Sequence, residues 1–189
     1  MTRALLADGT EVVLRAIEPS DREAYLEFHR GLSDESRYLR YFSARRRLPE
    51  NEVLHYLDVD QRDHAGIVAL VDGALVGHAL YDRNESGADA EVALEVSDTF
   101  QGRGVGTLML EELAKLARQM GITRLLAHVL PGNRRMLTVF RDLGFAERAT
   151  FEDGVLRVAL DLAADAGFDD SPRAREANAR AHRPGPRRK

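Results

Sequence analysis

A glycine-rich turn is the part of the sequence whose residues most clearly suit a chemical task. Residues 101–107 read QGRGVGT, follow an apolar run that ends at Val96, and lead into a long amphipathic stretch. The first N–H groups of a helix lack intrahelical partners and carry the positive end of its dipole, and glycine lets the backbone come close to a ligand. The turn therefore predicts a site for an anionic group such as a phosphate. The residues expected to hold it are Gln101, Gly102, Arg103, Gly104, Val105, Gly106 and Thr107.

The spacing within the turn excludes two common phosphate loops. The dinucleotide fingerprint needs a glycine at position 107, where Thr107 stands. The nucleoside-triphosphate loop needs Gly-Lys-Ser/Thr, and no lysine occurs between Ala88 and Glu112. The ligand should therefore carry phosphates without being a typical dinucleotide or triphosphate.

The elements that must position this turn alternate between strands and helices. Apolar and β-branched runs predict strands at 11–17, 67–71, 75–81, 89–96, 123–130, 145–151 and 155–162. Apolar spacing and caps predict helices at 20–29, 36–42, 49–57, 105–120 and 133–143, with Ser20 and Ser33 as N-caps. Asp72-Gly73 predicts a hairpin. This order predicts an α/β domain around one mixed sheet over residues 1–163, followed by a disordered tail at 164–189 that is rich in Arg, Ala and Pro.

Composition narrows the classes of partner. The 189 residues suit one domain, and the net charge of −4 gives no reason to expect a nucleic acid. Cysteine is absent, which excludes disulfides and thiol nucleophiles, and His64 and His78 lack the spacing of a metal site. No apolar run approaches the roughly 20 residues of a membrane span, and no signal peptide is evident. We expect a cytoplasmic protein, a monomer or weak dimer, with neither metal nor membrane as a partner.

The turn resembles the acyl-CoA pyrophosphate loop of the GNAT superfamily of N-acetyltransferases. The shared pattern is Q-x-x-G-x-G, formed here by Gln101, Gly104 and Gly106. The resemblance covers about Glu11 to Leu162. It implies the GNAT fold, a mixed and mostly antiparallel twisted sheet flanked by helices, with a parallel strand pair at the acyl-CoA site. It also implies acetyl-CoA as co-substrate.

The same resemblance implies further contacts with acetyl-CoA. In GNAT folds the strand before the loop pairs its backbone with the pantetheine arm, which assigns that role to Leu94 and Val96. Asn133 stands where a GNAT asparagine contacts the CoA arm, although it also suits a helix N-cap. Arg103 could add a charge-assisted contact to the pyrophosphate.

Acetyl transfer to an amine needs a base, and two glutamates are candidates. Glu91 and Glu95 should lie on one face of their strand, because strand side chains alternate. Apolar neighbours would raise the pKa of either carboxyl group and suit it to work near neutrality. Glu91 stands ten positions before Gln101, which resembles the general-base glutamate of bacterial protein lysine acetyltransferases. We therefore favour Glu91, with Glu95 in reserve and a solvated Glu91 as the plain alternative.

Two further stretches bear on the acceptor and the leaving group. Residues 36–42, SRYLRYF, resemble the second helix of the bacterial enzymes that modify acyl-CoA synthetases, where Tyr38, Tyr41 and Phe42 could wall a lysine stem. Many small-molecule GNATs carry a tyrosine four residues before the glycine of Leu143-Gly144-Phe145; this chain has Phe140, expected either beside the cofactor or in the core. Phenylalanine cannot donate a proton, so a thiolate would have to leave unassisted.

These features predict transfer of an acetyl group to a protein lysine, possible acceptors including an acyl-CoA synthetase. Direct attack is expected, since no cysteine can carry an acyl intermediate. A small-molecule amine N-acetyltransferase and a non-catalytic acyl-CoA sensor remain as alternatives.

Overall fold

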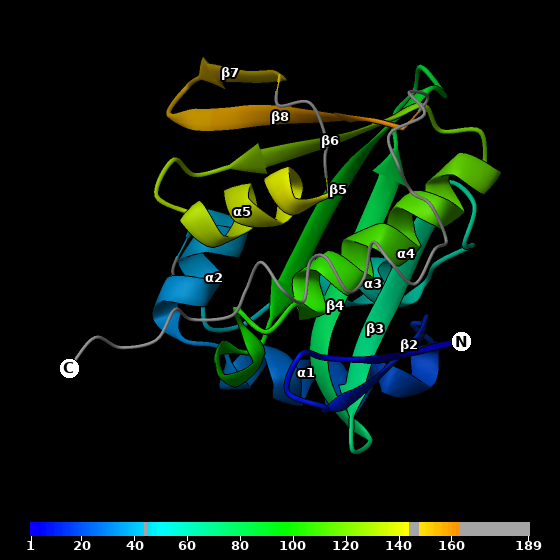
Figure 1. Cartoon of the computed structure of the whole chain (residues 1–189), viewed down its shortest axis with the longest axis vertical. Helices are drawn as coiled ribbons and strands as arrows, with labels where there is room; N and C mark the ends of the chain where they lie inside the picture. Colours follow the sequence, from blue (N-terminus) through cyan, green and yellow to red (C-terminus); the bar gives the residue numbers. More distant parts are fainter. Residues whose placement is uncertain (44, 144–147, 163–189) are drawn as a thin grey trace.

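A computed structural model describes residues 1–43, 45–143 and 148–162 of the chain (Figure 1). The predicted tail, together with Gly144 and Phe145 of the Leu-Gly-Phe motif, lies outside these residues. Within them the strands form an eight-stranded sheet in the order β1-β2-β3-β4-β5-β6-β8-β7. The strands are β1 Thr2–Leu5, β2 Glu11–Ala16, β3 His64–Val71, β4 Ala74–Arg83, β5 Asp89–Val96, β6 Arg124–Val129, β7 Arg148–Glu152 and β8 Val155–Asp161. The helices are α1 Arg22–Gly31, α2 Asp34–Tyr41, α3 Glu50–Leu57, α4 Val105–Gln119 and α5 Arg134–Asp142.

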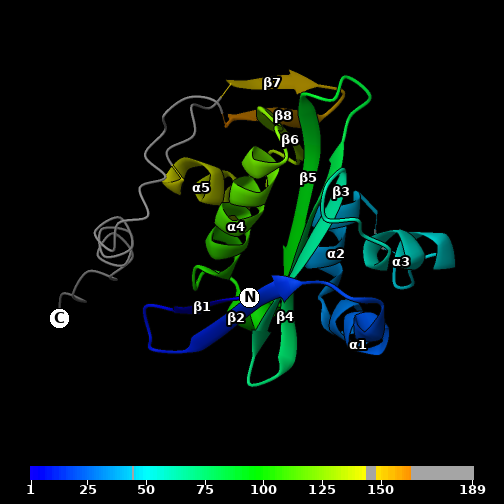
Figure 2. The ribbon, with the colours of Figure 1, turned by 90° about the vertical axis from the view of Figure 1, so that its right-hand side faces the viewer.

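Helices cover both faces of the sheet (Figure 2). Helices α4 and α5 lie on one face, and α1, α2 and α3 lie on the other. Each face has its own buried apolar cluster: one gathers around Met109, Leu110 and Leu113 of α4, and the other around Tyr25 of α1 and Val53 of α3. The amphipathic spacing of α4 explains this placement, since its apolar side chains recur on the side that meets the sheet.

The one parallel pair in the sheet, β5 with β6, is short. It pairs Asp89, Ala90 and Glu91 with Arg124, Leu125 and Leu126, and all other neighbouring strands are antiparallel. Beyond Glu91 the two strands diverge, as Figure 1 shows. The second half of β5 therefore has a neighbour on its β4 side alone, and its other edge is left open.

Local signals explain most of the element boundaries. The Ser33 side chain accepts a hydrogen bond from the Ser36 N–H at 3.1 Å and caps α2, as predicted. Asp72 and Gly73 both have positive φ values, of 50° and 80°, as the predicted two-residue hairpin turn requires. The predicted Ser20 cap is wrong, because a short 3-10 turn precedes α1 and Asp21 occupies the N-cap position.

The first strand was not predicted from the sequence. Thr2–Leu5 pairs antiparallel with β2 at the edge of the sheet and buries little, with Leu5 71% exposed. This segment is a strand because it is hydrogen-bonded to β2 across a turn, and not because its residues follow an apolar pattern.

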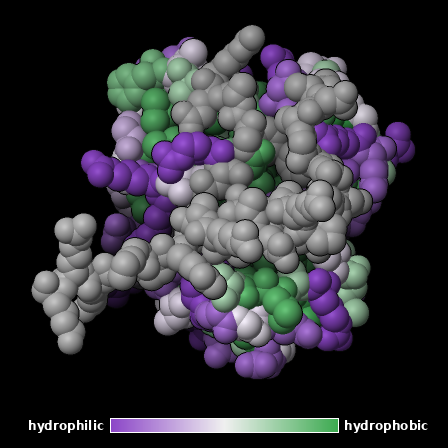
Figure 3. All heavy atoms as spheres, in the orientation of Figure 1, coloured by the Kyte–Doolittle hydropathy of each residue, from purple (hydrophilic) through white to green (hydrophobic). Residues whose placement is uncertain are grey.

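The surface shows where apolar side chains stay exposed. On the face that Figure 3 presents, hydrophilic side chains gather along both flanks, and hydrophobic ones gather at the upper left over β7 and β8 and at the lower edge. Phe151 of β7 is 66% exposed. Within the described part of the chain, no helix combines the length and the hydropathy needed to cross a bilayer.

Candidate active site

A cavity of about 930 Å³ occupies the opening beside the second half of β5. Its walls come from β5, the glycine-rich turn, the start of α5 and the helix α2. A volume of this size suits a cofactor-sized ligand. The predicted site residues that line it are Glu91, Leu94, Val96, Gln101, Gly102, Arg103, Gly104, Gly106, Thr107 and Asn133.

The glycine-rich turn has the backbone geometry of an anion site. Gly102 and Gly104 have φ values of 71° and 95°, which residues with a Cβ rarely adopt. A Cβ at Gly106 would meet Leu94 Cδ1 at 3.4 Å, so glycine also allows α4 to pack closely on β5. Within the described residues, no protein acceptor is bonded to the N–H of Gly102, Arg103 or Gly104. These N–H groups, at a helix N-terminus and beside a cavity, suit the phosphates of a ligand.

The open edge of β5 presents backbone groups to the same cavity. The Ser97 N–H donates to the Val76 carbonyl of β4 at 2.9 Å. Successive residues of a strand point their N–H and C=O groups to opposite sides, so those of Leu94 and Val96 point away from β4 and into the opening. This is the placement that a pantetheine arm lying along the strand would need.

Three polar side chains hold the walls of the cavity together. Gln101 donates from Nε2 to Ser36 Oγ of α2 at 2.9 Å and to the Val96 carbonyl at 3.0 Å. Its Oε1 accepts from Arg135 Nη1 of α5 at 2.5 Å. Gln101 thus links α2, β5 and α5 at one point, which its place in a sequence motif did not indicate.

Arg103 and Asn133 also have partners within the protein. Arg103 donates from Nε to Asp8 Oδ2 at 3.0 Å and lies over the ring of Phe100, so its guanidinium is held by the β1–β2 hairpin. Asn133 Oδ1 accepts the Met136 N–H at 3.1 Å and caps α5. Both residues line the cavity, but their side chains have a positioning role in this structure.

Two residues predicted beside the cofactor have their side chains elsewhere. Phe140 is 0% exposed in the core and does not line the cavity, so its position does not support a cofactor contact. Val105 is 1% exposed and packs in the same core, which leaves only its backbone for a ligand. The apolar spacing of both residues within their helices is the physical reason, because that spacing turns them toward the sheet.

Glu91 lines the cavity at the point where β5 and β6 begin to separate. Its side chain is 57% exposed, and Oε1 lies 3.2 Å from Nδ1 of His128 on β6. The apolar surroundings expected for Glu91 are absent. Its carboxylate is instead open to an incoming group, and His128 orients it. His128 was not anticipated, since nothing in the sequence pairs positions 91 and 128.

Glu95 lies four residues further along the same face of β5 and also lines the cavity, but its side chain is almost fully buried. Its side chain is 3% exposed. Tyr25 and Tyr41 each donate a hydroxyl hydrogen bond to it at 2.9 Å, and His78 Nδ1 lies 3.5 Å away on β4. Burial raises the pKa of Glu95, but the hydrogen bond from His78, the charge of Arg40 and the Tyr25 hydroxyl outweigh it, and the pKa is below its ordinary value. Glu95 is therefore a weak base that holds α1 and α2 against the sheet.

The predicted acceptor helix contributes part of the cavity wall. Tyr41 and Phe42 line the cavity, while Tyr38 is 50% exposed and outside it. Arg40 also lines the cavity, with its guanidinium 4.8 Å from the Tyr41 ring centroid.

A match to a protein family identifies the class of protein to which this cavity and fold belong. Residues 26–145, more than half of the chain, match the acetyltransferase (GNAT) family. The chain belongs to the GNAT family of acetyltransferases. The sheet with its single parallel pair, predicted from the sequence, is confirmed as a GNAT fold, and GNAT acetyltransferases use acetyl-CoA.

Similar GNAT proteins include bacterial Pat acetyltransferases. The chain is 35% identical over 141 residues to acetyltransferase Pat of Mycolicibacterium smegmatis, covering 72% of this chain and 41% of Pat. It is 28% identical to acetyltransferase PA5475 of Pseudomonas aeruginosa, covering 82% of this chain and 87% of that protein. The structure of the GNAT domain of S. lividans PAT has a TM-score of 0.80 and 38% identity, covering 85% of this chain and 96% of that domain. The predicted resemblance to this group is confirmed, although the chain spans only about two fifths of M. smegmatis Pat.

A bound co-substrate is seen in a more distant GNAT neighbour. A putative acetyltransferase from Salmonella typhimurium, solved with acetyl-CoA, shares the fold with a TM-score of 0.64 at 20% identity. In the present chain the glycine turn, the open edge of β5 and the cavity between them fit such a molecule, because they combine free N–H donors with an apolar channel.

Sequence spacing predicted no metal site, yet the structure brings three possible metal ligands together. His55, His64 and Asp82 come from α3, β3 and β4, and their ligand atoms lie within 4.8 Å of one another. No local motif could indicate this cluster, because its members meet only when the helix packs on the sheet.

Proposed function

We propose that this GNAT protein transfers an acetyl group from acetyl-CoA to the ε-amine of a protein lysine, with Glu91 as general base. The observation that carries the proposal is the position of Glu91. Its exposed carboxylate lines the same cavity as the glycine-rich turn that suits a phosphate group. An amine entering at Glu91 and a thioester lying along β5 would meet within one cavity.

The donor would be held by backbone groups along the cavity. The N–H groups from Gly102 to Gly106 suit the pyrophosphate, and the β5 edge at Leu94 and Val96 suits the pantetheine arm. A backbone N–H near Val96 would polarise the thioester carbonyl and stabilise the oxyanion that forms on attack.

The reaction needs one base and no covalent intermediate. Glu91 takes a proton from the lysine ammonium, directly or through water, which frees the nitrogen lone pair. The nitrogen attacks the thioester carbon, the C–S bond breaks, and the nitrogen gives up its second proton, which the departing thiolate takes up through solvent. The products are an N-acetyl-lysine and CoA. The thiolate needs little help to leave, because thiols are far more acidic than alcohols. Glu95 is a poorer choice of base, since its carboxylate is enclosed and already accepts hydrogen bonds from Tyr25 and Tyr41.

Two observations favour a protein acceptor. Helix α2 lines part of the cavity; Tyr38 of this helix is 50% exposed and Phe42, directly after it, is 41% exposed, which gives a protein surface apolar side chains to contact. The chain also resembles the GNAT domain of S. lividans PAT closely in both sequence and fold. The acceptor we favour is an acyl-CoA synthetase in the cytoplasm, met by this protein as a monomer or weak dimer.

An acceptor screen tests the proposal. The purified protein is incubated with a bacterial lysate and isotope-labelled acetyl-CoA, and the label is located by mass spectrometry. Labelled lysines on proteins, above the level with the Glu91→Gln variant, are the expected result. Label found only on small amines would replace the protein acceptor with a small-molecule one. Binding of acetyl-CoA with no labelled acceptor of either kind would favour the non-catalytic sensor.

A further inference from the structure

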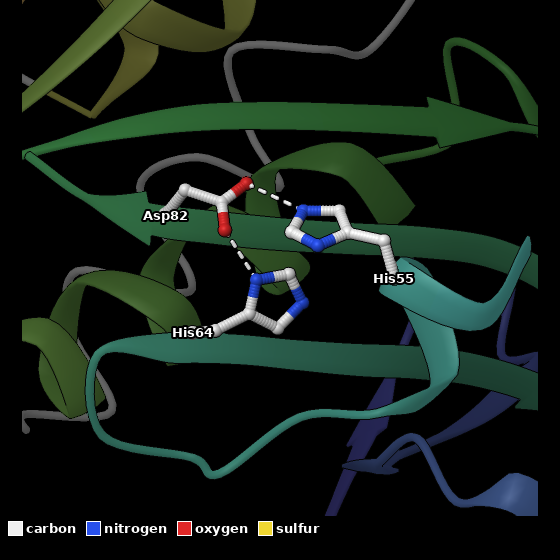
Figure 4. Close-up of side chains that lie close together, drawn as sticks. All are labelled: His55, His64 and Asp82. Atoms are coloured by element: carbon white, nitrogen blue, oxygen red, sulfur yellow. Dashed lines mark hydrogen bonds and ion pairs between the residues drawn. The ribbon is translucent and has the colours of Figure 1, made fainter. Parts of the chain in front are cut away.

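Two histidines and one aspartate converge outside the acetyl-transfer cavity (Figure 4). The rings of His55 and His64 approach the two oxygens of the Asp82 carboxylate from different elements. His55 Nε2 lies 3.1 Å from Asp82 Oδ2, and His64 Nδ1 is hydrogen-bonded to Asp82 Oδ1. The two imidazole rings are themselves close, with centroids 4.1 Å apart. Three atoms of the kinds that bind metals, two imidazole nitrogens and a carboxylate oxygen, therefore lie within 4.8 Å of one another.

The fold holds each of these residues in place. His64 and Asp82 are direct partners in the β3–β4 register, and neighbouring antiparallel partners point to the same side of a sheet. Asp60 fixes the start of β3, because its Oδ1 accepts the His64 N–H at 2.9 Å as well as those of Arg62 and Asp63. His55 lies on α3. The buried residues of this helix pack on the sheet and so bring His55 over the pair.

We propose that His55, His64 and Asp82 bind a divalent transition-metal ion, with Zn²⁺ the best fit. Two imidazole nitrogens with one carboxylate oxygen are a typical zinc ligand set, whereas Mg²⁺ and Ca²⁺ prefer oxygen ligands alone. Zinc–nitrogen bonds of about 2.0–2.1 Å place tetrahedral ligand atoms about 3.3 Å apart. The 3.1 Å between His55 Nε2 and Asp82 Oδ2 is close to that value, so small side-chain rotations would form the site. The fourth position would remain open to water.

The two ring nitrogens of His64 have different surroundings. His64 Nε2 is buried without a hydrogen-bond partner within the described residues, which leaves Nδ1 as the ligand atom. Binding through Nδ1 requires the ring hydrogen to lie on the buried Nε2, because a neutral imidazole carries a single N–H.

The proposed metal site is separate from the acetyl-transfer cavity but close to Glu91, the proposed general base. None of the three residues lines the cavity. Asp82 is nevertheless the register partner of Glu91 on β5, so the ion would lie one strand away from the proposed base. Metal binding can be measured without acetyl transfer, and the proposal does not depend on the identity of the acceptor.

Calorimetry with the full chain tests the site. Metal-stripped protein is titrated with Zn²⁺ at neutral pH, and we expect binding of one ion per chain. His55→Gln and Asp82→Asn should each weaken it by at least about tenfold, since each removes one of three protein ligands. These two side chains are 51% and 40% exposed, so their variants should fold; an unchanged unfolding midpoint without metal checks this. Binding of Co²⁺ should produce the intense visible absorption of a four-coordinate ion.

A matched control separates this site from other histidines. His128→Gln alters another exposed His–carboxylate pair, His128 with Glu91, and should leave zinc affinity unchanged. The proposal is overturned if wild-type protein does not bind Zn²⁺, if affinity survives both His55→Gln and Asp82→Asn, or if it is lost in His128→Gln.

Discussion

The two glutamates of β5 lie on one face of one strand and have opposite surroundings. Glu91 is at the last position paired with β6, where the strands separate, and its side chain is 57% exposed. Glu95 lies four residues further along the strand. Its side chain is 3% exposed and accepts hydrogen bonds from Tyr25 and Tyr41. The difference arises from the neighbouring elements, since α1 and α2 cover one end of the strand face and leave the other uncovered. Strand alternation can therefore name both carboxylates but cannot tell which is reachable.

This contrast assigns chemistry to Glu91 and stability to Glu95. Substituting glutamine at each position keeps the shape of the side chain and removes its charge. The Glu91 variant should lose turnover, whereas the Glu95 variant should lose stability.

The largest expected effect is on turnover by Glu91→Gln. Loss of the base should lower kcat about 10²- to 10⁴-fold, as is typical for general-base catalysis. The free energy of unfolding should stay within about 0.5 kcal/mol of the wild type, because the side chain is exposed. Steady-state acetyl transfer and urea unfolding measure the two quantities. Glu27→Gln, an exposed change on α1, is the control that should alter neither. Full turnover by Glu91→Gln would remove the residue from catalysis.

The next effect is on the stability of Glu95→Gln. The amide cannot accept all the hydrogen bonds that the carboxylate accepts from Tyr25, Tyr41 and His78, so buried donors lose partners. We expect the free energy of unfolding to fall by about 1–3 kcal/mol. Urea unfolding followed by circular dichroism measures it. A variant as stable as the wild type would show that the network contributes no net stability.

The pH dependence of stability should report on the ionised state of Glu95. The pKa of Glu95 is lowered in the folded protein, so the unfolded chain binds the proton more readily. The stabilisation from ionised Glu95 is complete above the ordinary value of 4.5 and is lost as the pH falls through the lower folded pKa. The wild type should therefore lose more stability between pH 6 and pH 3 than Glu95→Gln. Parallel losses in the two proteins would contradict this, and a series of urea midpoints across that range measures it.

A smaller effect is expected from the residue that orients Glu91. His128→Asn removes the 3.2 Å contact to the carboxylate. Because the pair is exposed, kcat should fall only about two- to fivefold. The KM for acetyl-CoA should not change, because the hydrogen bond of the His128 side chain is to Glu91 and not to the glycine turn. A rise in that KM with unchanged kcat would indicate a role in donor binding instead.

The smallest effect is expected at the edge of the donor site. Asp8→Ala removes the carboxylate partner of Arg103 in the β1–β2 hairpin and leaves its hydrogen bond to Thr10 Oγ1 at 2.8 Å. Exposed ion pairs contribute little, so the KM for acetyl-CoA should change by no more than about twofold. Steady-state kinetics with acetyl-CoA as the varied substrate measures it. A tenfold rise would show that the hairpin is needed to hold the glycine turn.

Much of the fold could be predicted from local signals. Hydrophobic periodicity, the Asp72-Gly73 turn and the Ser33 cap are properties of a few neighbouring residues, and the predicted strand at Asp89–Val96 agrees with β5. Thr2–Leu5 could not be predicted in this way, because its pairing with β2 rather than its own pattern makes it a strand.

Some features of the candidate site could likewise be predicted from neighbouring residues, and others could not. The glycine turn is contiguous in sequence, and its φ values follow from its composition. The partners of Glu91 and Glu95 come from distant segments, as does the cluster of His55, His64 and Asp82. Only packing brings these residues together. The sequence can therefore identify a candidate carboxylate but cannot predict which side chains surround it.

Turnover of Glu91→Gln and Glu95→Gln, measured side by side, tests the central claim most directly. Both variants are assayed with saturating acetyl-CoA and acceptor, at a temperature at which circular dichroism shows both to be folded. Glu91→Gln should have a kcat at least about tenfold below that of Glu95→Gln. An equal or lower kcat for Glu95→Gln would contradict the assignment of the base to the exposed end of β5.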